Sequence, residues 1–219
     1  MKKFIISDWL ILATLIVPFL VLAFTWNMFP EEVPIHFDMD GNPDRYARKV
    51  FGLLIFPGLN ILLYLFLILV PRIDPKRKNY ELFEDKYRII RLIIHLFIAF
   101  VFFVIAAYTL GYTVDITRMV MYGVIVILLV FGNYMGNIRM NYFVGIRTPW
   151  TLASEMVWRK THRFTARLWV SACMAMLIGL PFIPGGYIIA LLVFVGVITV
   201  IPIVYPYIVY RSLPRVEQR

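Results

Sequence analysis

Charged residues are scarce in this chain and unequal in sign. Only 16% of the residues are Asp, Glu, Lys or Arg, whereas 61% are hydrophobic, and the mean hydropathy is +0.79. An ordinary soluble domain carries about 25% charged residues. The composition therefore excludes a typical soluble globular protein. It predicts an integral membrane protein, with room in 219 residues for one membrane domain and no sizeable soluble one.

Cysteine and enzyme motifs are nearly absent as well. The one cysteine, Cys173, lies in an apolar run, so an intramolecular disulfide is excluded and the redox compartment cannot be read. The chain contains neither H-E-x-x-H nor G-x-S-x-G, and no close pair of acidic residues within an apolar stretch. Only Glu155 and His162 in one connector offer acid–base groups. We therefore expect no enzyme, no catalytic residue, no cofactor and no direct nucleic-acid binding.

Long apolar stretches make up most of the chain. Six of them are long enough to cross a bilayer, which takes about 20 helical residues. Their approximate bounds are Trp9–Met28, Phe51–Val70, Ile89–Leu110, Met119–Met135, Leu168–Phe182 and Tyr187–Tyr210. The fifth is short, so we expect its helix to extend into the connector before it. Between the last two, Pro184-Gly185-Gly186 predicts a tight turn.

The basic residues are distributed unevenly among the connectors. Most of the 22 Lys and Arg residues lie in alternate segments, namely both termini and the second and fourth connectors. Cytoplasmic loops carry the positive excess in membrane proteins, so we expect both termini in the cytoplasm. The net charge of +9 is then mainly a topology signal. The second connector's basic cluster, Arg72 and residues 76–78, also suits anionic membrane lipids.

The first outside connector, residues 30–49, has the pattern of a short hairpin. Val33, Ile35 and Phe37 alternate with other residues as in a strand, and Asp40-Gly41-Asn42-Pro43 has turn chemistry. The acidic residues here also permit a calcium-loop interpretation. An EF-hand, however, needs Gly at position 6 and Glu at position 12 of its loop. This chain has Pro43 and Lys49 there, so we favour a hairpin over a metal site.

Three polar residues interrupt the apolar stretches: Asn60, His95 and Asn133. Polar groups within a bilayer usually face protein or water. His95 is either a proton carrier or a residue hydrogen-bonded to a neighbouring helix. We expect the second role, with His95 paired inside the helix bundle.

The fourth connector, residues 132–169, is the most polar long segment. Asn133, Asn137 and Asn141 recur every four residues, which places them on one face if the fourth helix continues. Gly145 predicts a bend. Thr148-Pro149 predicts a helix start, with Thr as N-cap and Pro at the first helical position.

The residues after that start have the composition of an interfacial helix. Trp150 and Trp158 with neighbouring basic residues suit a membrane surface. The segment is either a simple amphipathic connector that steers the fifth span or an ordered cytoplasmic platform. On the platform hypothesis, residues 141–163 are ordered, and Arg147 bonds backbone carbonyls or a carboxylate. Glu155 is then its nearest acidic partner in the connector, and lipid phosphate is the rival partner.

Two long motifs resemble a known family. N-Y-F-V-G-I-R-T-P-W-T-L and W-R-K-T-H-R, within residues 132–170, resemble the signature of the SdpI family of bacterial membrane proteins. V-P-I-H-F-D-M-D-G-N-P-D-R-Y in the first connector resembles an uncharacterised domain often found at the N-terminus of that family. Together with the apolar pattern, this resemblance implies an all-α integral membrane protein of six transmembrane helices. It would have an extracytoplasmic hairpin after the first helix and an amphipathic cytoplasmic helix before the fifth.

The resemblance implies two regions in the chain and a set of candidate functional residues. Residues 1–112 would form the N-terminal membrane region and residues 113–219 the SdpI-like region of one integrated bundle. The cytoplasmic-motif candidates are Asn133, Asn137, Asn141, Gly145, Arg147, Thr148, Pro149, Trp150, Glu155, Trp158, His162 and Arg163. The extracytoplasmic-motif candidates are Pro34, His36, Phe37, Gly41 and Asp44, and the intramembrane polar candidates are Asn60 and His95.

The resemblance implies an immunity function. The protein would lie in the bacterial cytoplasmic membrane and protect against a secreted antimicrobial peptide toxin. It would also take part in signalling by holding a transcriptional repressor at the membrane when toxin is present. The alternative that the residues leave open is a small transporter or channel that uses Asn60, His95 and Asn133 along its path.

Overall fold

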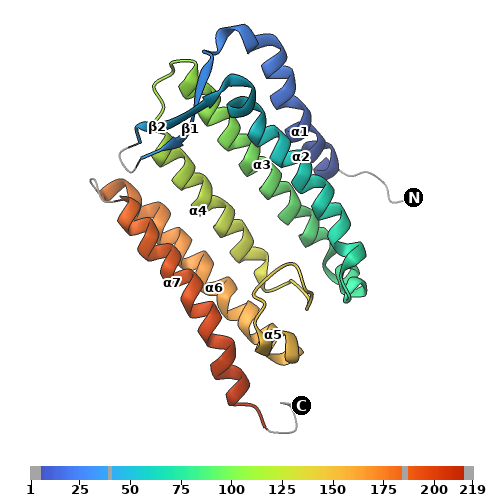
Figure 1. Ribbon diagram of the computed structural model, residues 1–219. Helices are drawn as coiled ribbons and strands as arrows, with labels where there is room; N and C mark the ends of the chain where they lie inside the picture. Colours follow the sequence, from blue (N-terminus) through green and yellow to red (C-terminus); the bar gives the residue numbers. More distant parts are fainter. Residues whose placement is uncertain (1–5, 39–40, 184–186, 215–219) are drawn as a thin grey trace. The chain divides into compact units, whose positions relative to one another are not determined.

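The protein consists almost entirely of helices joined by short connections. The computed structural model describes residues 6–38, 41–183 and 187–214 (Figure 1). Its seven α-helices are α1 Ile6–Thr25, α2 Lys49–Ile73, α3 Glu84–Thr109, α4 Ile116–Met135, α5 Pro149–Ala153, α6 Glu155–Gly179 and α7 Tyr187–Arg211. The strands β1 Glu32–Phe37 and β2 Pro43–Arg48 form its only sheet within the described residues. Three 3-10 helices cover Trp26–Met28, Arg77–Phe83 and Leu180–Phe182.

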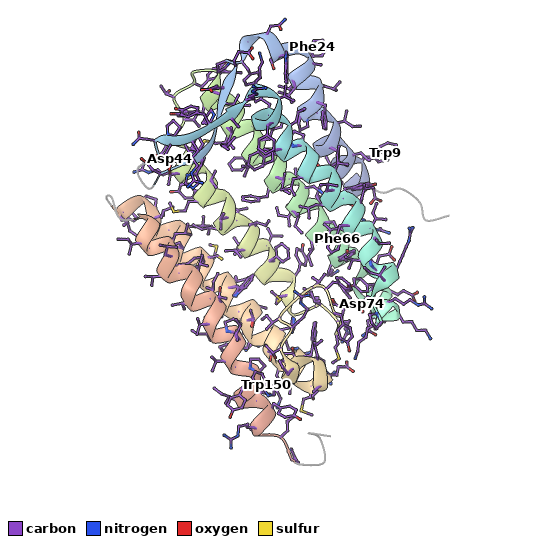
Figure 2. The ribbon with its side chains drawn as sticks, in the orientation of Figure 1. Trp9, Phe24, Asp44, Phe66, Asp74 and Trp150 are labelled. Carbon is purple, nitrogen blue, oxygen red and sulfur yellow. The ribbon has the colours of Figure 1, made fainter. Side chains whose placement is uncertain are left out.

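Six of these helices are long and apolar enough to cross a membrane. Each of them overlaps one of the six stretches expected from the sequence, so the prediction of six spans is confirmed. Large apolar side chains cover the outside of the helices, where a soluble protein would be polar. On α1, for example, Trp9 and Phe24 point outward and are 62% and 85% exposed (Figure 2). Such a continuous apolar exterior fits contact with lipid.

The fifth span differs from the sequence estimate at its start. As expected, it borrows residues from the connector before it, because α6 begins at Glu155 and runs without a break to Gly179. The expected amphipathic helix is therefore mostly the first part of α6, and only the five residues of α5 are separate. Ser154 divides the two helices because its backbone is extended, with φ −138° and ψ 124°. The turn expected at Pro184-Gly185-Gly186 lies outside the described residues.

The chain folds into two compact units, which interleave along the sequence. The first comprises Met1–Leu67 with Arg91–Val124, and the second Ile68–Ile90 with Ile125–Arg219. The division between residues 112 and 113 concerned regions of family resemblance, and it stays a prediction. The core of the first unit is formed by Leu22, Phe29, Val33, Leu53, Phe102, Ile105 and Ala106.

The hairpin belongs to the first unit and was predicted correctly. β1 and β2 pair antiparallel, with Val33 opposite Ala47 and Phe37 opposite Pro43. Val33 is fully buried, but Ile35 is 38% exposed, because the strand register shifts between Pro34 and His36. The expected simple alternation is wrong at that position. A bulge of this kind turns the following side chains to the other face of the strand.

In the second unit, α6 and α7 pack side by side (Figure 1). The ring of Phe164 stacks on that of Tyr205 at 4.2 Å, and Trp169 Nε1 donates a hydrogen bond to the Ile198 carbonyl. Near the start of α6, Val157 packs with Val209 and Leu213 of the chain's last helix and tail. These contacts hold α6, which follows the polar connector, against α7.

Candidate functional site

The connector between α4 and α6 is organised around Asn141, which is 0% exposed. Its amide nitrogen donates to the carbonyls of Arg139 and Val144 at 2.8 and 2.9 Å. Its amide oxygen accepts from the backbone N–H groups of Phe143 and Val144 at 2.9 and 2.6 Å. A buried amide that is satisfied in this way defines one backbone path. Residues 139–144 are therefore an ordered turn.

A buried acidic residue from the α2–α3 connection joins the same turn. Asp74 is 2% exposed. One carboxylate oxygen accepts from the N–H of Lys76 at 2.7 Å, and the other accepts from the N–H of Tyr142 at 2.9 Å. Hydrogen bonds from N–H groups are the means by which a protein keeps a buried carboxylate stable. Asp74 thus ties two connectors together, although 68 residues separate it from Tyr142.

Tyr80 and Asn79 reinforce this junction from the 3-10 helix before α3. The Tyr80 hydroxyl lies 3.1 Å from the Asp74 carboxylate and 3.2 Å from the Asn141 amide oxygen, and shares its one hydrogen between them. Asn79 donates from its side chain to the Met140 carbonyl at 2.6 Å. We call the set formed by Asp74, Asn79, Tyr80 and Asn141 the buried junction.

His162 of α6 holds the next part of the connector. It is 1% exposed, and its Nδ1 lies 2.9 Å from the Trp158 carbonyl. Its Nε2 accepts the N–H of Ile146 at 3.1 Å. A ring that donates from Nδ1 and accepts at Nε2 is a neutral imidazole. Gly145 passes directly over this ring with φ +109°, and the space available there admits no side chain.

Trp158 lies beneath His162 and completes this contact. Its ring stacks on the imidazole, with centroids 4.0 Å apart and an interplanar angle of 18°. Trp158 is 0% exposed, and its Nε1 donates to the Ile138 carbonyl at 2.8 Å. Trp158, which was expected at a membrane surface, is therefore a core residue. Its indole holds the connector just after the end of α4, at Ile138.

The helix start predicted at Thr148-Pro149 is present. Thr148 accepts the N–H of Thr151, while the Thr151 hydroxyl accepts the N–H of Thr148, and Pro149 occupies the first turn of α5. The Thr151 hydroxyl also lies 2.9 Å from the Ile146 carbonyl. Trp150 packs against Tyr207 of α7 with ring centroids 5.0 Å apart. The local chemistry of the motif thus produces the cap, and the aromatic contact anchors it.

Arg147 and Glu155 do not form the expected pair. Arg147 Nη1 instead donates to the Tyr142 carbonyl at 2.8 Å, and no ion pair joins it to Glu155 in the described part of the chain. Glu155 lies in the first turn of α6, where a negative charge interacts favourably with the helix dipole. The expectation that Arg147 bonds a backbone carbonyl holds, whereas the carboxylate partner is wrong.

The three asparagines of the motif do not share one face. α4 ends at Met135, so the four-residue spacing has no helix to act on beyond that residue. Asn133 and Asn137 are exposed, and only Asn141 is buried. A common face required a continued fourth helix, and this condition is not met. Arg163, the last residue of the second motif, is exposed on α6 and lines a cavity that Asn137 also lines.

In the first unit, His95 and Asn60 bond to each other. His95 Nδ1 lies 2.7 Å from Asn60 Oδ1, and both residues are buried. Asn60 Nδ2 is 3.3 Å from the Thr14 carbonyl of α1 and 3.4 Å from the His95 carbonyl of α3. One amide therefore connects α1, α2 and α3. His95 Nε2 has no partner among the described residues.

We predict that His95 is structural. His95→Leu removes the donor to the buried Asn60 oxygen and is expected to lower the unfolding free energy by about 1–3 kcal/mol. His95→Asn, which retains a donor, is expected to lose less. Thermal unfolding in detergent measures both, and Asn60→Leu with His95→Leu should cost less than the two single changes added together. A His95→Asn protein that folds normally but loses all activity would contradict the structural role.

Four of the extracytoplasmic-motif residues, namely His36, Phe37, Gly41 and Asp44, lie near the turn of the hairpin, whereas Pro34 lies further along β1. His36 Nδ1 lies 2.6 Å from Asp44 Oδ1, and both side chains are exposed. Gly41 has φ +84°, as a tight turn requires. Phe37 packs edge-on against Tyr108 at 5.3 Å, and Pro34 is buried. No group of three or more possible metal ligands occurs among the described residues, and Asp40 lies outside them.

Several residues of the site escaped the sequence analysis. Asp74, Asn79 and Tyr80 carry its hydrogen bonds, yet no motif includes them. Thr151 lies within the motif N-Y-F-V-G-I-R-T-P-W-T-L but was not singled out as a candidate. One signal was present for Asp74: it is an acidic residue directly after a span, amid basic neighbours. An isolated carboxylate at such a place needs hydrogen-bond donors, and the connector supplies them.

These features define the class of protein. It is a multi-pass helical membrane protein in which a short hairpin follows the first span and a hydrogen-bonded connector precedes the fifth. Residues 137–206 match the SdpI/YfhL protein family, and residues 13–61 match a domain of unknown function, DUF1648. The family resemblance derived from the two motifs is thereby confirmed.

A curated relative matches most of the chain. The immunity protein SdpI of Bacillus subtilis (strain 168) is 29% identical over 194 residues, which cover 88% of this chain and 88% of that protein. That relative is named an immunity protein. No solved structure matches the chain.

Proposed function

We propose that this protein is an immunity protein of the bacterial cytoplasmic membrane that protects its cell against a secreted peptide toxin. The observation that carries the proposal is the similarity to the Bacillus subtilis immunity protein along 88% of both chains. A match of this length includes both units and both motifs, so the similarity is not limited to a single part of the chain. The ordered connector is compatible with it as well, because its buried hydrogen bonds hold the family motif in one conformation.

The direct test is survival under toxin. The gene is expressed in a toxin-sensitive bacillus that lacks its own immunity gene, and the cells are challenged with purified peptide toxin from a producing strain. Cells that carry the gene should survive at concentrations that kill the vector control. Equal killing of both strains, with the protein present in the membrane by immunoblot, would refute the proposal for that toxin.

The finer part of the proposal is signalling. Toxin would be recognised by the hairpin and the outer parts of the helices, and a transcriptional repressor would be held by the cytoplasmic connectors. The exposed charged side chains at the start of α6, including Arg159 and Lys160, offer a polar surface for such a partner. Fractionation of cells with and without toxin tests this role. A repressor that stays soluble in both conditions would contradict it.

A transporter is the second candidate, and one observation favours it. The unpartnered Nε2 of His95 is a titratable group buried between helices, which is the kind of group that proton relays use. The bond between His95 and Asn60 supports a structural role instead. The His95→Asn protein separates the two functions, because a relay requires a titrating ring and a structural bond does not.

The proposed orientation can be measured with single cysteines in a Cys173→Ser background. Tyr46 lies on the hairpin and Lys78 on the α2–α3 connection, and both are exposed. In intact cells, Tyr46→Cys should react with a membrane-impermeant maleimide, whereas Lys78→Cys should react only after the membrane is permeabilised. The expected sides follow from the positive-inside distribution of Lys and Arg. Labelling of Lys78→Cys in intact cells would reverse the assigned orientation.

A further inference from the structure

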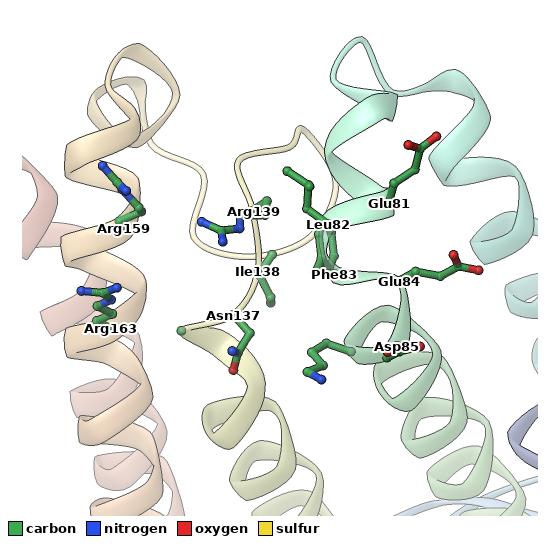
Figure 3. Close-up of a pocket in the computed structure, with 12 residues that line it drawn as sticks. Glu81, Leu82, Phe83, Glu84, Asp85, Asn137, Ile138, Arg139, Arg159 and Arg163 are labelled. Atoms are coloured by element: carbon green, nitrogen blue, oxygen red, sulfur yellow. The ribbon is translucent and has the colours of Figure 1, made fainter.

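A polar cavity of about 340 Å³ opens in the second unit, outside the buried junction. Three segments line it: the end of the 3-10 helix before α3 with the first residues of α3, the first residues of the connector after α4, and α6 (Figure 3). Its volume lies at the lower end of the range for small-ligand sites, about 300–1,000 Å³. The site is therefore large enough for a small charged group.

Three arginines line one part of this cavity. They are Arg139 of the connector and Arg159 and Arg163 of α6. None of the three forms a salt bridge with any residue that the structure describes. Arginine carries a permanent charge and a planar fork of donors that matches a phosphate or a carboxylate. Glu81, Glu84 and Asp85 line the same cavity, but none of the three arginines is ion-paired with them in the described part of the chain. The three guanidinium groups together therefore form a receptor for an anion.

The acidic residues of the cavity do not neutralise these arginines. Figure 3 shows the carboxylates of Glu81 and Glu84 directed away from α6. Glu84 instead pairs with Arg88 one turn further along α3, at 2.5 Å. The negative charge is thus partly compensated on the α3 side, and the side formed by the three arginines stays positive.

The backbone that carries the arginines is held in place. Arg159 and Arg163 are four residues apart on one helix, so their side chains share a face. The Arg139 carbonyl accepts a hydrogen bond from the side-chain amide of Asn141 at 2.8 Å. The preceding Ile138 carbonyl accepts a hydrogen bond from Trp158 Nε1, also at 2.8 Å. A preorganised backbone lowers the entropy that ligand binding costs.

We propose that this cavity binds the phosphate group of a membrane phospholipid. Arg159 and Arg163 lie in the first turns of the candidate span Glu155–Phe182, and Arg139 follows the end of α4 at Met135. The cavity is therefore at the level where spans end, which is where lipid headgroups lie. An inorganic or small soluble phosphate shares the same chemistry, and the experiment separates the two sources.

The test uses the purified full-length protein in detergent with a soluble short-chain phosphatidylglycerol as the probe. Affinity is measured by microscale thermophoresis. The Arg159→Gln/Arg163→Gln protein is expected to bind at least tenfold more weakly than the wild type. Its matched control is Lys160→Gln/Arg167→Gln, which removes the same charge from exposed positions of α6 that do not line the cavity. The control is expected to stay within twofold of the wild type.

The outcomes distinguish the site from general charge effects. Equal weakening in the control, or unchanged binding in the double variant, overturns the proposal. Inorganic phosphate that binds as tightly as the lipid probe overturns the assignment to lipid. Circular dichroism and gel filtration check folding, and if the double variant does not fold, Arg139→Gln on the connector replaces it with an expected loss of at least threefold. The result is independent of toxin survival, so it stands or fails separately from the immunity function.

Discussion

Replacing Asn141 with leucine is expected to destabilise the second unit by about 3–5 kcal/mol, and to abolish protection at the growth temperature. The side chain is fully buried and satisfies backbone groups of Arg139, Phe143 and Val144. Leucine has a similar volume but no polar atoms, so these groups lose their partners inside the protein. Each buried group without a partner costs about 1–3 kcal/mol.

The sequence supplies a matched control for this prediction. Asn137 lies in the same connector, has the same side chain and is exposed. Asn137→Leu should therefore change the unfolding free energy by no more than about 0.5 kcal/mol. Thermal unfolding in detergent gives the stability difference, and protease digestion of inverted vesicles shows whether residues 139–147 have become accessible. Similar effects of the two substitutions would show that the buried hydrogen bonds of Asn141 do not hold the connector.

Gly145→Ala is expected to have the second large effect, a loss of about 2–4 kcal/mol of stability. Two causes act together. The backbone at Gly145 has φ +109°, which an alanine rarely adopts. In addition, a Cβ built there would collide with Nε2 of His162, the atom that accepts the Ile146 N–H. The collision would displace the imidazole and release that backbone group.

Gly136→Ala is the control for this substitution. A Cβ at Gly136 would meet no atom closer than 3.8 Å, which is an ordinary contact, and the residue has no positive φ. Its effect should stay within about 0.5 kcal/mol. The collision itself is tested with a double-mutant cycle: in a His162→Ala background, Gly145→Ala should cost less than in the wild type. An equal cost in both backgrounds would assign the whole effect to backbone strain and exclude the collision with His162.

The sequence alone determined the features that depend on local chemistry. Length and hydropathy located the six spans, because crossing a bilayer requires about 20 apolar residues in succession. Turn chemistry located the hairpin, and Thr148 with Pro149 located the start of α5, because a helix cap is satisfied by residues within one turn. Gly145 was correctly expected at a bend for a similarly local reason.

Only the tertiary structure decided which of these residues are buried and what they contact. The spacing of Asn133, Asn137 and Asn141 is regular, yet only Asn141 is buried, because α4 ends before the series does. Asp74 meets Tyr142 across 68 residues, and no local pattern encodes such a partner. The arginines of the cavity likewise come together only because the connector and α6 fold toward the start of α3. Contacts of this kind depend on the packing of elements distant in sequence, whereas spans, turns and caps depend on residues a few positions apart.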